Sequence, residues 1–581
     1  MMDWFSPYDN SRKIGSVIDI KPTEALINLS EAGTGEFNWS FGQNLSKGEV
    51  NDLVFIDVGE ISILGKITRT WLENSERLSV ERKNSSIQNN PIGQVTFLST
   101  VDPVSGKVSK GIKHHPKLCA QVYSAHPLLV ALISENRDLS SEKALYLPIA
   151  ELPHDDSITI HATPESLFSR HCAILGSTGG GKSYTVSNLV HQIQEHGGKV
   201  LLIDPTGEFS ELQGNSYYVG EHPLADNTNK VTFPHWLFSD SDMRAFLKPS
   251  PQSQLPKMDE AIRSLKLINA INYYTQGNTT YTHNLTTDNQ TITKAKKSKI
   301  DFFQQTTFFQ NCLTPKSYWS FQNLGTQILK ECIYPTDFNN ESVYGGVAPN
   351  DEGYCLSLVS RINAYTQNPY LKWMIDPDQN LTNLPYLLEN FVSNDDNLVR
   401  LDLSSVPFES NSREILVNAI GRELLSLARK GKISHTSPLI VFIDEAHQFL
   451  NKKLGEDTTS YLLDAFGNIA KEGRKYGLNI VIATQRPRDI PEDVLSQIGS
   501  LIVHRLSNQQ DQDIVKKASG EMDSRTASFI PSLGQGEALL MGIDFPFPMY
   551  VKMKMPKYQP TSQSSSFSNA WNKTDNSQAT P

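Results

Sequence analysis

Residues 172–186 read CAILGSTGGGKSYTV, and the rest of the chain can be interpreted from this segment outward. A short apolar run, residues 173–175, enters a loop at 176–183 that matches the pattern G-x-x-x-x-G-K-[ST] at every position. The residues from Tyr184 to His191 are compatible with a helix. A strand, a glycine-rich loop and a helix in this order are typical of a phosphate-binding loop.

Each part of this loop has a chemical task. Glycines tolerate positive φ angles and let consecutive backbone N–H groups turn toward a polyphosphate. The N-terminus of the following helix adds partial positive charge at the same point. Lys182 would reach the β- and γ-phosphates of ATP, and the Ser183 hydroxyl would coordinate Mg²⁺. The predicted ATP-binding residues are Gly176, Ser177, Thr178, Gly179, Gly180, Gly181, Lys182, Ser183 and Tyr184. The alternative is a glycine-rich turn that binds nothing.

Length and composition indicate the number of domains, the kind of surface and the compartment of the protein. A chain of 581 residues exceeds what one hydrophobic core usually fills, so two or three domains are expected. A formal net charge of −10 argues against a basic surface that coats nucleic acid, although it leaves room for a locally basic channel. The five cysteines include no C-x-x-C pair, which fits a reducing compartment and gives no zinc signature. We expect a cytoplasmic protein, because no signal peptide and no membrane-length apolar run is present.

The N-terminal part of the chain reads as a small β-barrel or sandwich. Short β-type runs alternate with turn residues up to about Thr70, and strand-like segments resume after the polar stretch at 73–90. The expected strands cover residues 14–20, 24–30, 52–59, 61–71, 92–101 and 118–125. We interpret this region as an oligomerisation or docking barrel without chemistry of its own.

The remainder alternates buried-type strands with helices, which predicts a doubly wound parallel sheet. The segments 199–212, 397–406 and 438–450 contain buried-type strands. The apolar run of the first ends at Asp204 and that of the third at Asp444, and ligands bind at the carboxyl edge of such sheets. Between them, residues 238–395 look mostly helical and carry no catalytic motif, and residues 276–299 look like an exposed, mobile loop.

The chain therefore predicts an α/β fold, a RecA-like P-loop NTPase core with an N-terminal β-barrel and a mostly helical insertion. The predicted divisions are 1–150 for the barrel and connector, 151–237 for the first part of the core, 238–395 for the insertion, 396–556 for the second part of the core and 557–581 for a disordered tail.

Residues 438–450 indicate the second half of an NTPase site. Five apolar residues lead to Asp444, whose carboxylate would serve the Mg²⁺ shell, and to Glu445, which would orient or deprotonate the attacking water. Gln485 ends the strand-like segment LNIVIAT and could sense the γ-phosphate or its water. Arg474 precedes that segment, and an arginine donated by a neighbouring subunit is a plausible role for it. The simple alternatives are an ordinary strand end for the carboxylates and a solvated charge for the arginine.

With these motifs in hand, the chain resembles the HerA branch of the HerA–FtsK translocase family. The resemblance covers nearly everything except the helical block and the tail. It is carried by Arg170-His171, GSTGGGKS (176–183), DPTGEF (204–209), IDEAH (443–447), EGRKYG (472–477), ATQRP (483–487), HRLSNQQD (504–511) and GEALL (536–540). Gly180 departs from the serine usual there, and we expect no effect because this position contributes backbone.

The resemblance implies a homohexameric ring that uses ATP and Mg²⁺ to thread double-stranded DNA. It implies a separate partner, either a NurA-like nuclease or an antiviral effector such as a sirtuin-like NADase. By matching position, Lys182 and Ser183 hold phosphates and Mg²⁺, Asp444 and Glu445 serve metal and water, and Gln485 senses the nucleotide. Arg474 and Arg170 are candidates to reach a neighbour's site.

The prediction of DNA-contacting residues depends on two adjacent lysines and on no motif. A channel that follows duplex phosphates needs inward Lys or Arg side chains, and Lys452 and Lys453 just after the second motif are candidates, although a solvated loop is the simpler interpretation. A regulatory ATPase ring that assembles and gates an effector in phage defence, with little translocation, remains the alternative function. A metabolic kinase or GTPase is disfavoured, because the motifs indicate no acceptor-substrate pocket.

Overall fold

The computed structural model describes residues 7–32, 39–40, 43–44, 48–72, 91–104, 106–135, 145–153, 155–277, 281–288, 290–450, 452–454, 460–519 and 527–561. The polar stretch at 73–90 and the predicted tail from residue 562 onward lie outside these residues. The chain forms two compact units, Met1–Gln192 with Val481–Lys557 and Ile193–Ile480 with Tyr558–Pro581, and each is described by itself.

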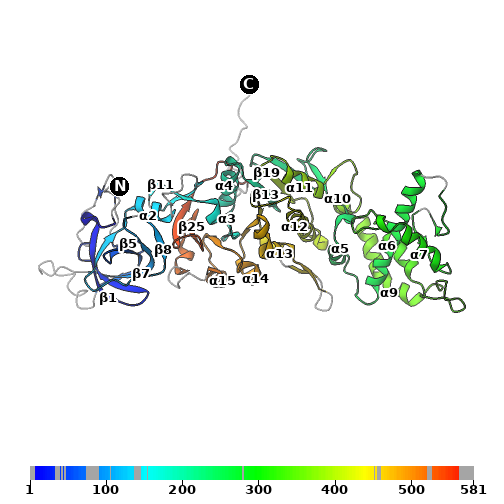
Figure 1. The fold of residues 1–581 in the computed structure, drawn as a ribbon, viewed down its shortest axis with the longest axis horizontal. Helices are drawn as coiled ribbons and strands as arrows, with labels where there is room; N and C mark the ends of the chain where they lie inside the picture. The colour runs from blue at the N-terminus through cyan, green and yellow to red at the C-terminus, as the bar shows by residue number, and fades with distance from the viewer. Residues whose placement is uncertain are drawn as a thin grey trace, which may run out of the picture. The chain divides into compact units, whose positions relative to one another are not determined.

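The first unit begins with a closed six-stranded antiparallel barrel, drawn in blue in Figure 1. Its strands follow the order β2-β1-β9-β5-β6-β7, and pairing of β2 with β7 closes the ring. These strands are β1 (Lys13–Ile20), β2 (Glu24–Asn28), β5 (Leu53–Asp57), β6 (Ser62–Trp71), β7 (Ile92–Val101) and β9 (Gln121–Ser124). Inward-facing aliphatic side chains such as Ile14, Val54 and Val95 are fully buried and fill the interior. The predicted N-terminal barrel is confirmed, and each barrel strand overlaps a predicted segment.

The rest of the first unit is a mixed sheet in the order β11-β10-β26-β25-β24-β12-β23. The central strand β12 (Cys172–Leu175) is buried at every residue and pairs in parallel with β23 (Leu478–Thr484) and β24 (Ser500–Val503). Helix α4 (Lys182–Glu195) follows β12 after the glycine-rich loop. The strands β25 (Glu537–Gly542), β26 (Met549–Met553), β10 (Leu147–Leu152) and β11 (Asp155–Ala162) extend the sheet in antiparallel fashion.

Two lysines of the barrel contact this sheet. Lys110, the last residue of β8 (Val108–Lys110), donates to the carbonyl of Gly542 over 3.1 Å at the end of β25. The ammonium of Lys66 on β6 lies 3.9 Å from the ring centre of Tyr550 on β26 and 4.7 Å from that of Phe529. Because Lys66 is only 4% exposed, these desolvated cation–π contacts are worth more than surface ones. The barrel is thereby attached to β25 and β26.

The second unit contains a fully parallel sheet in the order β20-β13-β19-β14-β15-β18. Its strands are β13 (Lys199–Asp204), β14 (Asn215–Val219), β15 (Lys230–Thr232), β18 (Thr382–Asn383), β19 (Leu398–Asp402) and β20 (Leu439–Ile443). The strand β19 is buried at all five residues, as expected for a parallel strand that helices cover on both faces. The helices α11 (Leu384–Ser393), α12 (Ser412–Arg429) and α13 (Ala465–Glu472) alternate with these strands in the chain. The predicted α/β core is confirmed.

The predicted insertion is mostly helical, as expected, and appears in green in Figure 1. It contains α5 (Asp240–Leu247), α6 (Gln254–Gly277), α7 (Lys299–Phe308), α8 (Leu324–Glu331), α9 (Pro349–Thr366) and α10 (Lys372–Ile375). Helix α5 begins where it does because Ser239 and Asp242 form a capping box that satisfies two exposed backbone donors. The exact domain boundaries predicted from the sequence remain predictions.

One expectation for the insertion is wrong in part. The sequence predicts an exposed, mobile loop at 276–299, but within this segment Ile292 in β17 (Ile292–Thr293) is fully buried. Lys294 is 5% exposed, and its ammonium forms a 2.7 Å ion pair with the buried carboxylate of Glu331. A polar composition concealed this packing, because the buried lysine is compensated by a residue on a distant helix.

No helix within the described ranges is both long enough and apolar enough to cross a membrane.

Candidate functional site

The glycine-rich loop occupies residues 176–181, directly between β12 and α4. Gly179 and Gly181 have φ angles of +75° and +115°, a conformation that side-chain-bearing residues rarely adopt. Thr178 and Gly179 at the tip are exposed, whereas Lys182 at the start of the helix is 6% exposed. A loop with an accessible backbone and a desolvated lysine has the form needed to hold a polyphosphate.

Gln485, which lies outside the glycine-rich loop in the sequence, contacts the loop through its side chain. The side-chain oxygen of Gln485, which follows the last residue of β23, accepts a hydrogen bond of 2.5 Å from the Thr178 hydroxyl. The two residues are brought together because β12 and β23 are neighbouring parallel strands, so both of their carboxyl ends reach the same sheet edge. Of the residues predicted for catalysis, Gln485 is therefore in direct contact with a predicted ATP-binding residue.

Arg505 anchors the same loop through its backbone. The carbonyl oxygen of Arg505 accepts from the backbone N–H of Ser177 over 2.9 Å and from the Ser177 hydroxyl over 2.8 Å. The backbone N–H of Gly536 donates to the carbonyl of Gly180 over 3.1 Å. These supports come from the segments HRLSNQQD and GEALL, to which the sequence assigned no individual role.

Asp444 and Glu445 lie in the second unit, at the carboxyl end of β20. Asp444 is 1% exposed, and its backbone N–H donates to the carbonyl of Ile203 on the neighbouring β13 over 3.2 Å. Glu445 is 6% exposed and has left-handed backbone angles, with φ at 47° and ψ at 40°. Its carboxylate lies 3.3 Å from Nδ1 of His447. A left-handed glutamate costs conformational energy, and such strain persists mainly where a particular side-chain direction is needed.

A buried cluster of three charges, which was not predicted from the sequence, lies next to this strand end. The guanidinium of Arg400 on β19 bonds the carboxylates of Asp204 over 2.8 Å and Asp402 over 3.0 Å. The Asp204 carboxylate also accepts from the backbone N–H groups of Gly207 and Phe209. Asp204 thus fixes the DPTGEF turn and is occupied by that task. An arginine inside an otherwise apolar strand was the available signal, because a buried charge needs a partner.

The two candidate arginines differ in their surroundings. Arg474 lies in the short helix η8 (Gly473–Tyr476) and is exposed, and no ion pair of its guanidinium occurs among the residues that the structure describes. Arg170 is 40% exposed, and its Nε lies 3.8 Å from the carboxylate of Asp544. An ion pair as exposed as this is weak and exchanges readily for another anion.

The candidate DNA-contacting lysines lie in a short hairpin of β21 (Lys452–Leu454) and β22 (Tyr461–Leu463), although a loop was expected. Lys452 is half-buried and pairs with Glu414 at 3.2 Å. Lys453 is exposed, because successive side chains of a strand point to opposite faces and the side chain of Lys452 is directed toward Glu414. Of the two, Lys453 is the better placed to meet a phosphate.

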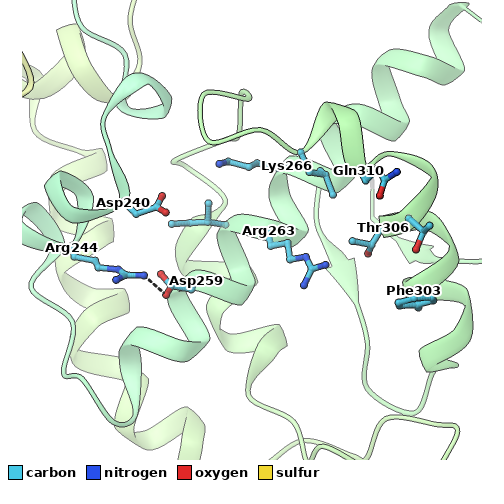
Figure 2. A pocket seen from close by; sticks show the side chains of 11 residues that line it. Asp240, Arg244, Asp259, Arg263, Lys266, Phe303, Thr306 and Gln310 are labelled. Atoms are coloured by element: carbon cyan, nitrogen blue, oxygen red, sulfur yellow. Dashed lines mark hydrogen bonds and ion pairs between the residues drawn. The ribbon is translucent and has the colours of Figure 1, made fainter. Parts of the chain in front are cut away.

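The helical insertion contains a polar pocket of about 490 Å³, which Figure 2 shows from close by. On one wall Arg244 and Asp259 form a 2.7 Å ion pair. Arg263 and Lys266 lie one turn apart on α6, and Phe303 of α7 is 70% exposed on the opposite side. Burial lowers the pKa of Lys266, whose ammonium is also bonded to the carbonyls of Thr314 and Pro315. No local sequence pattern indicates this pocket, because its lining comes from α5, α6, α7 and the segment at 310–313.

Comparisons with known proteins bear on the identity of the site. A family model described as "Helicase HerA, central domain" matches residues 147–322, and one described as "Helicase HerA-like C-terminal" matches residues 423–574. A "DNA double-strand break repair helicase HerA" of Saccharolobus solfataricus is 26% identical over 396 residues, which cover 67% of this chain and 65% of that protein. A "Probable DNA double-strand break repair helicase HerA" of Methanocaldococcus jannaschii is 25% identical over 432 residues, covering 70% of this chain and 76% of that protein.

Among solved structures, VirB4 of Thermoanaerobacter pseudethanolicus is similar with a TM-score of 0.44 and 12% identity, covering 73% of this chain and 99% of that chain.

Proposed function

Since this chain is a HerA-like ATPase, we propose that it hydrolyses ATP to move along double-stranded DNA. The observation that carries the proposal is the hydrogen bond between Thr178 and Gln485, because it joins the phosphate loop to a polar residue at the same sheet edge. In this proposal Gln485 senses the γ-phosphate or its attacking water from that position.

The residues of the site fit Mg²⁺ and a nucleoside triphosphate. Backbone N–H groups of the loop and the ammonium of Lys182 would bind phosphate oxygens, and the half-buried Ser183 hydroxyl and the Asp444 carboxylate would hold the metal. Mg²⁺, when bound, neutralises part of the phosphate charge. Glu445 accepts the proton of the attacking water, and Gln485 orients that water.

The working assembly that we propose is a homohexameric ring with duplex DNA in its channel. The N-terminal barrel is the docking site for a separate partner, either a NurA-like nuclease or an antiviral effector such as a sirtuin-like NADase. Apolar side chains fill the interior of the barrel where the structure describes it, so a partner would bind the outer surface of the barrel.

The ATPase rate of the purified protein, with and without linear duplex DNA, tests this function when it is combined with the mass in solution. We expect duplex DNA to stimulate hydrolysis several-fold in a ring-sized particle. A ring that hydrolyses ATP at the same rate with and without DNA would contradict translocation and favour a ring that assembles and gates an effector. A protein that hydrolyses no ATP would contradict both.

Arg474→Ala should leave ATP binding intact and lower hydrolysis about a thousandfold, because an arginine donated by a neighbour stabilises charge in the transition state. The measurement is ATPase activity of mixed rings. Adding Glu445→Gln subunits, which keep Arg474, should restore part of the activity of Arg474→Ala subunits. Lys475→Ala, which removes the adjacent exposed charge, is the control and should behave as wild type. If no mixing ratio restores activity, Arg474 does not act on a neighbouring subunit.

Lys453→Ala should weaken stimulation by duplex DNA, because one phosphate contact is lost. The slope of the logarithm of the DNA affinity against the logarithm of the salt concentration should become smaller in magnitude by about one. The measurement is the DNA concentration for half-maximal ATPase stimulation at several salt concentrations. Lys517, whose side chain is 72% exposed on α15 (Gln509–Ser519), provides the matched control. Lys452→Ala is less informative, since it also leaves Glu414 without its partner. Equal salt slopes for Lys453→Ala and Lys517→Ala would remove Lys453 from the DNA-contacting surface.

A further inference from the structure

His504 lies fully buried against the phosphate loop, at the carboxyl end of β24. Its backbone N–H donates to the carbonyl of Leu175, the last residue of β12, over 2.7 Å. Its ring nitrogens have separate partners: Nδ1 lies 2.9 Å from the carbonyl oxygen of Glu537, and Nε2 lies 2.9 Å from the hydroxyl of Thr185. His504 therefore joins three elements of the first unit.

The partners of the ring determine its tautomer. A carbonyl oxygen can only accept, so Nδ1 carries the proton and donates to Glu537. Nε2 is then left with its lone pair and accepts from the hydroxyl of Thr185, a fully buried residue in the first turn of α4. Burial lowers the pKa of His504 to about 4, and the nearby charge of Lys182 acts in the same direction. The ring is thus neutral near pH 7 and leaves the positive charge at the loop to Lys182.

The ring also packs against the glycines of the loop. A Cβ atom placed on Gly176 would lie 2.7 Å from the Cβ of His504, and one on Gly181 would lie 3.2 Å from its Cε1. At Gly180 the corresponding distance to the His504 Cβ is 3.4 Å. The close approach of His504 therefore disfavours a side chain at residues 176 and 181, and the positive φ of Gly181 disfavours one there independently. The loop thus follows the contour of the histidine.

We propose that His504 is a positioning residue for nucleotide binding, which holds the phosphate loop in its binding conformation through the Thr185 hydroxyl and through contact with the loop glycines. The inference rests on the proposed function of the loop as an ATP site. His504 itself touches no phosphate in this role. It acts through Thr185, which fixes the first turn of the helix that carries Lys182 and Ser183.

The test compares two variants of Thr185. Thr185→Ser keeps the hydroxyl that Nε2 needs, whereas Thr185→Val keeps the side-chain shape and removes the hydroxyl. We expect Thr185→Val to raise the dissociation constant of ATP and the KM about tenfold, which corresponds to about 1.4 kcal/mol. The kcat at saturating ATP should change less than twofold. Thr185→Ser should bind ATP within twofold of wild type.

His504→Asn is the second variant, because its amide NH2 can still donate toward Glu537, whereas the shorter side chain has no ring and places no acceptor at the position of Nε2 that faces Thr185. It should show the same rise in KM as Thr185→Val. Inorganic pyrophosphate is a second probe, since it reports on the phosphate loop without the adenosine, and its affinity should fall in parallel. A residue that merely stabilised the fold would lower the melting temperature and the active fraction without changing KM.

The outcomes distinguish a failure of the positioning role of His504 from a failure of the proposed ATPase function. If wild type binds ATP and both Thr185→Val and His504→Asn keep its KM, the positioning role of His504 is wrong while the proposed function stands. If wild type neither binds nor hydrolyses ATP, the proposed function is wrong, whatever the variants do.

Discussion

Replacing Lys182 by alanine is expected to abolish ATP hydrolysis, with a loss of at least about a hundredfold in turnover. Lys182 is 6% exposed at the start of α4, so water screens its charge little and the attraction of its ammonium for phosphate oxygens is strong. Without it, the backbone donors of the loop remain but the charge that develops during phosphoryl transfer is no longer compensated. Release of inorganic phosphate from ATP measures the effect directly.

The control for Lys182→Ala is Lys113→Ala, which removes an exposed lysine of the barrel and alters the net charge by the same amount. It should hydrolyse ATP at the wild-type rate. Brisk turnover by Lys182→Ala would mean that the loop at 176–183 is not the hydrolytic site, and the roles given to Ser183, Thr178 and Gln485 would fall with it.

Glu445→Gln is expected to bind ATP with nearly normal affinity and to turn it over about a hundredfold to ten-thousandfold more slowly, because an amide of the same shape cannot accept the proton of the attacking water. The left-handed backbone at Glu445 is retained, since glutamine tolerates it no better and no worse. The measurements are the ATP dissociation constant by calorimetry and a single-turnover hydrolysis rate.

Glu472→Gln supplies the matched control, because Glu472 is 41% exposed and pairs with Arg429 on the surface of the second unit. Its hydrolysis rate should equal that of wild type. If Glu445→Gln hydrolyses ATP as fast as Glu472→Gln, another group takes the proton and Glu445 serves only the turn after β20.

The core was predictable from the sequence because local patterns and the fold agree there. The run Cys172–Leu175 is apolar at every residue and is followed by glycines, and a buried parallel strand before a glycine-rich loop gives that pattern. The strand β20 was recognisable for the same reason, because five apolar residues are followed directly by Asp444. The barrel strands were recognisable because turn residues separate them at short intervals.

The parts that escaped prediction depend on contacts between distant residues. His504 and Thr185 are 319 positions apart, so nothing in either local sequence indicates their hydrogen bond. Arg400 was placed in a strand, but its pairing with Asp204 depends on the neighbouring order of β13 and β19. Lys294 looked like a surface residue because its partner, Glu331, lies on a helix whose position no periodicity specifies.

The strand β25 is held at its two ends by different parts of the first unit. At one end the backbone around Gly536 and Glu537 bonds the phosphate loop and His504, and at the other end Gly542 accepts from Lys110 of the barrel. Six residues of β-strand span about 20 Å, and their hydrogen bonds to both neighbouring strands prevent the strand from shortening. A partner whose binding to the barrel displaces β25 must therefore change the affinity of the loop for nucleotide. Thermodynamic reciprocity then requires nucleotide to change the affinity of that partner by the same factor.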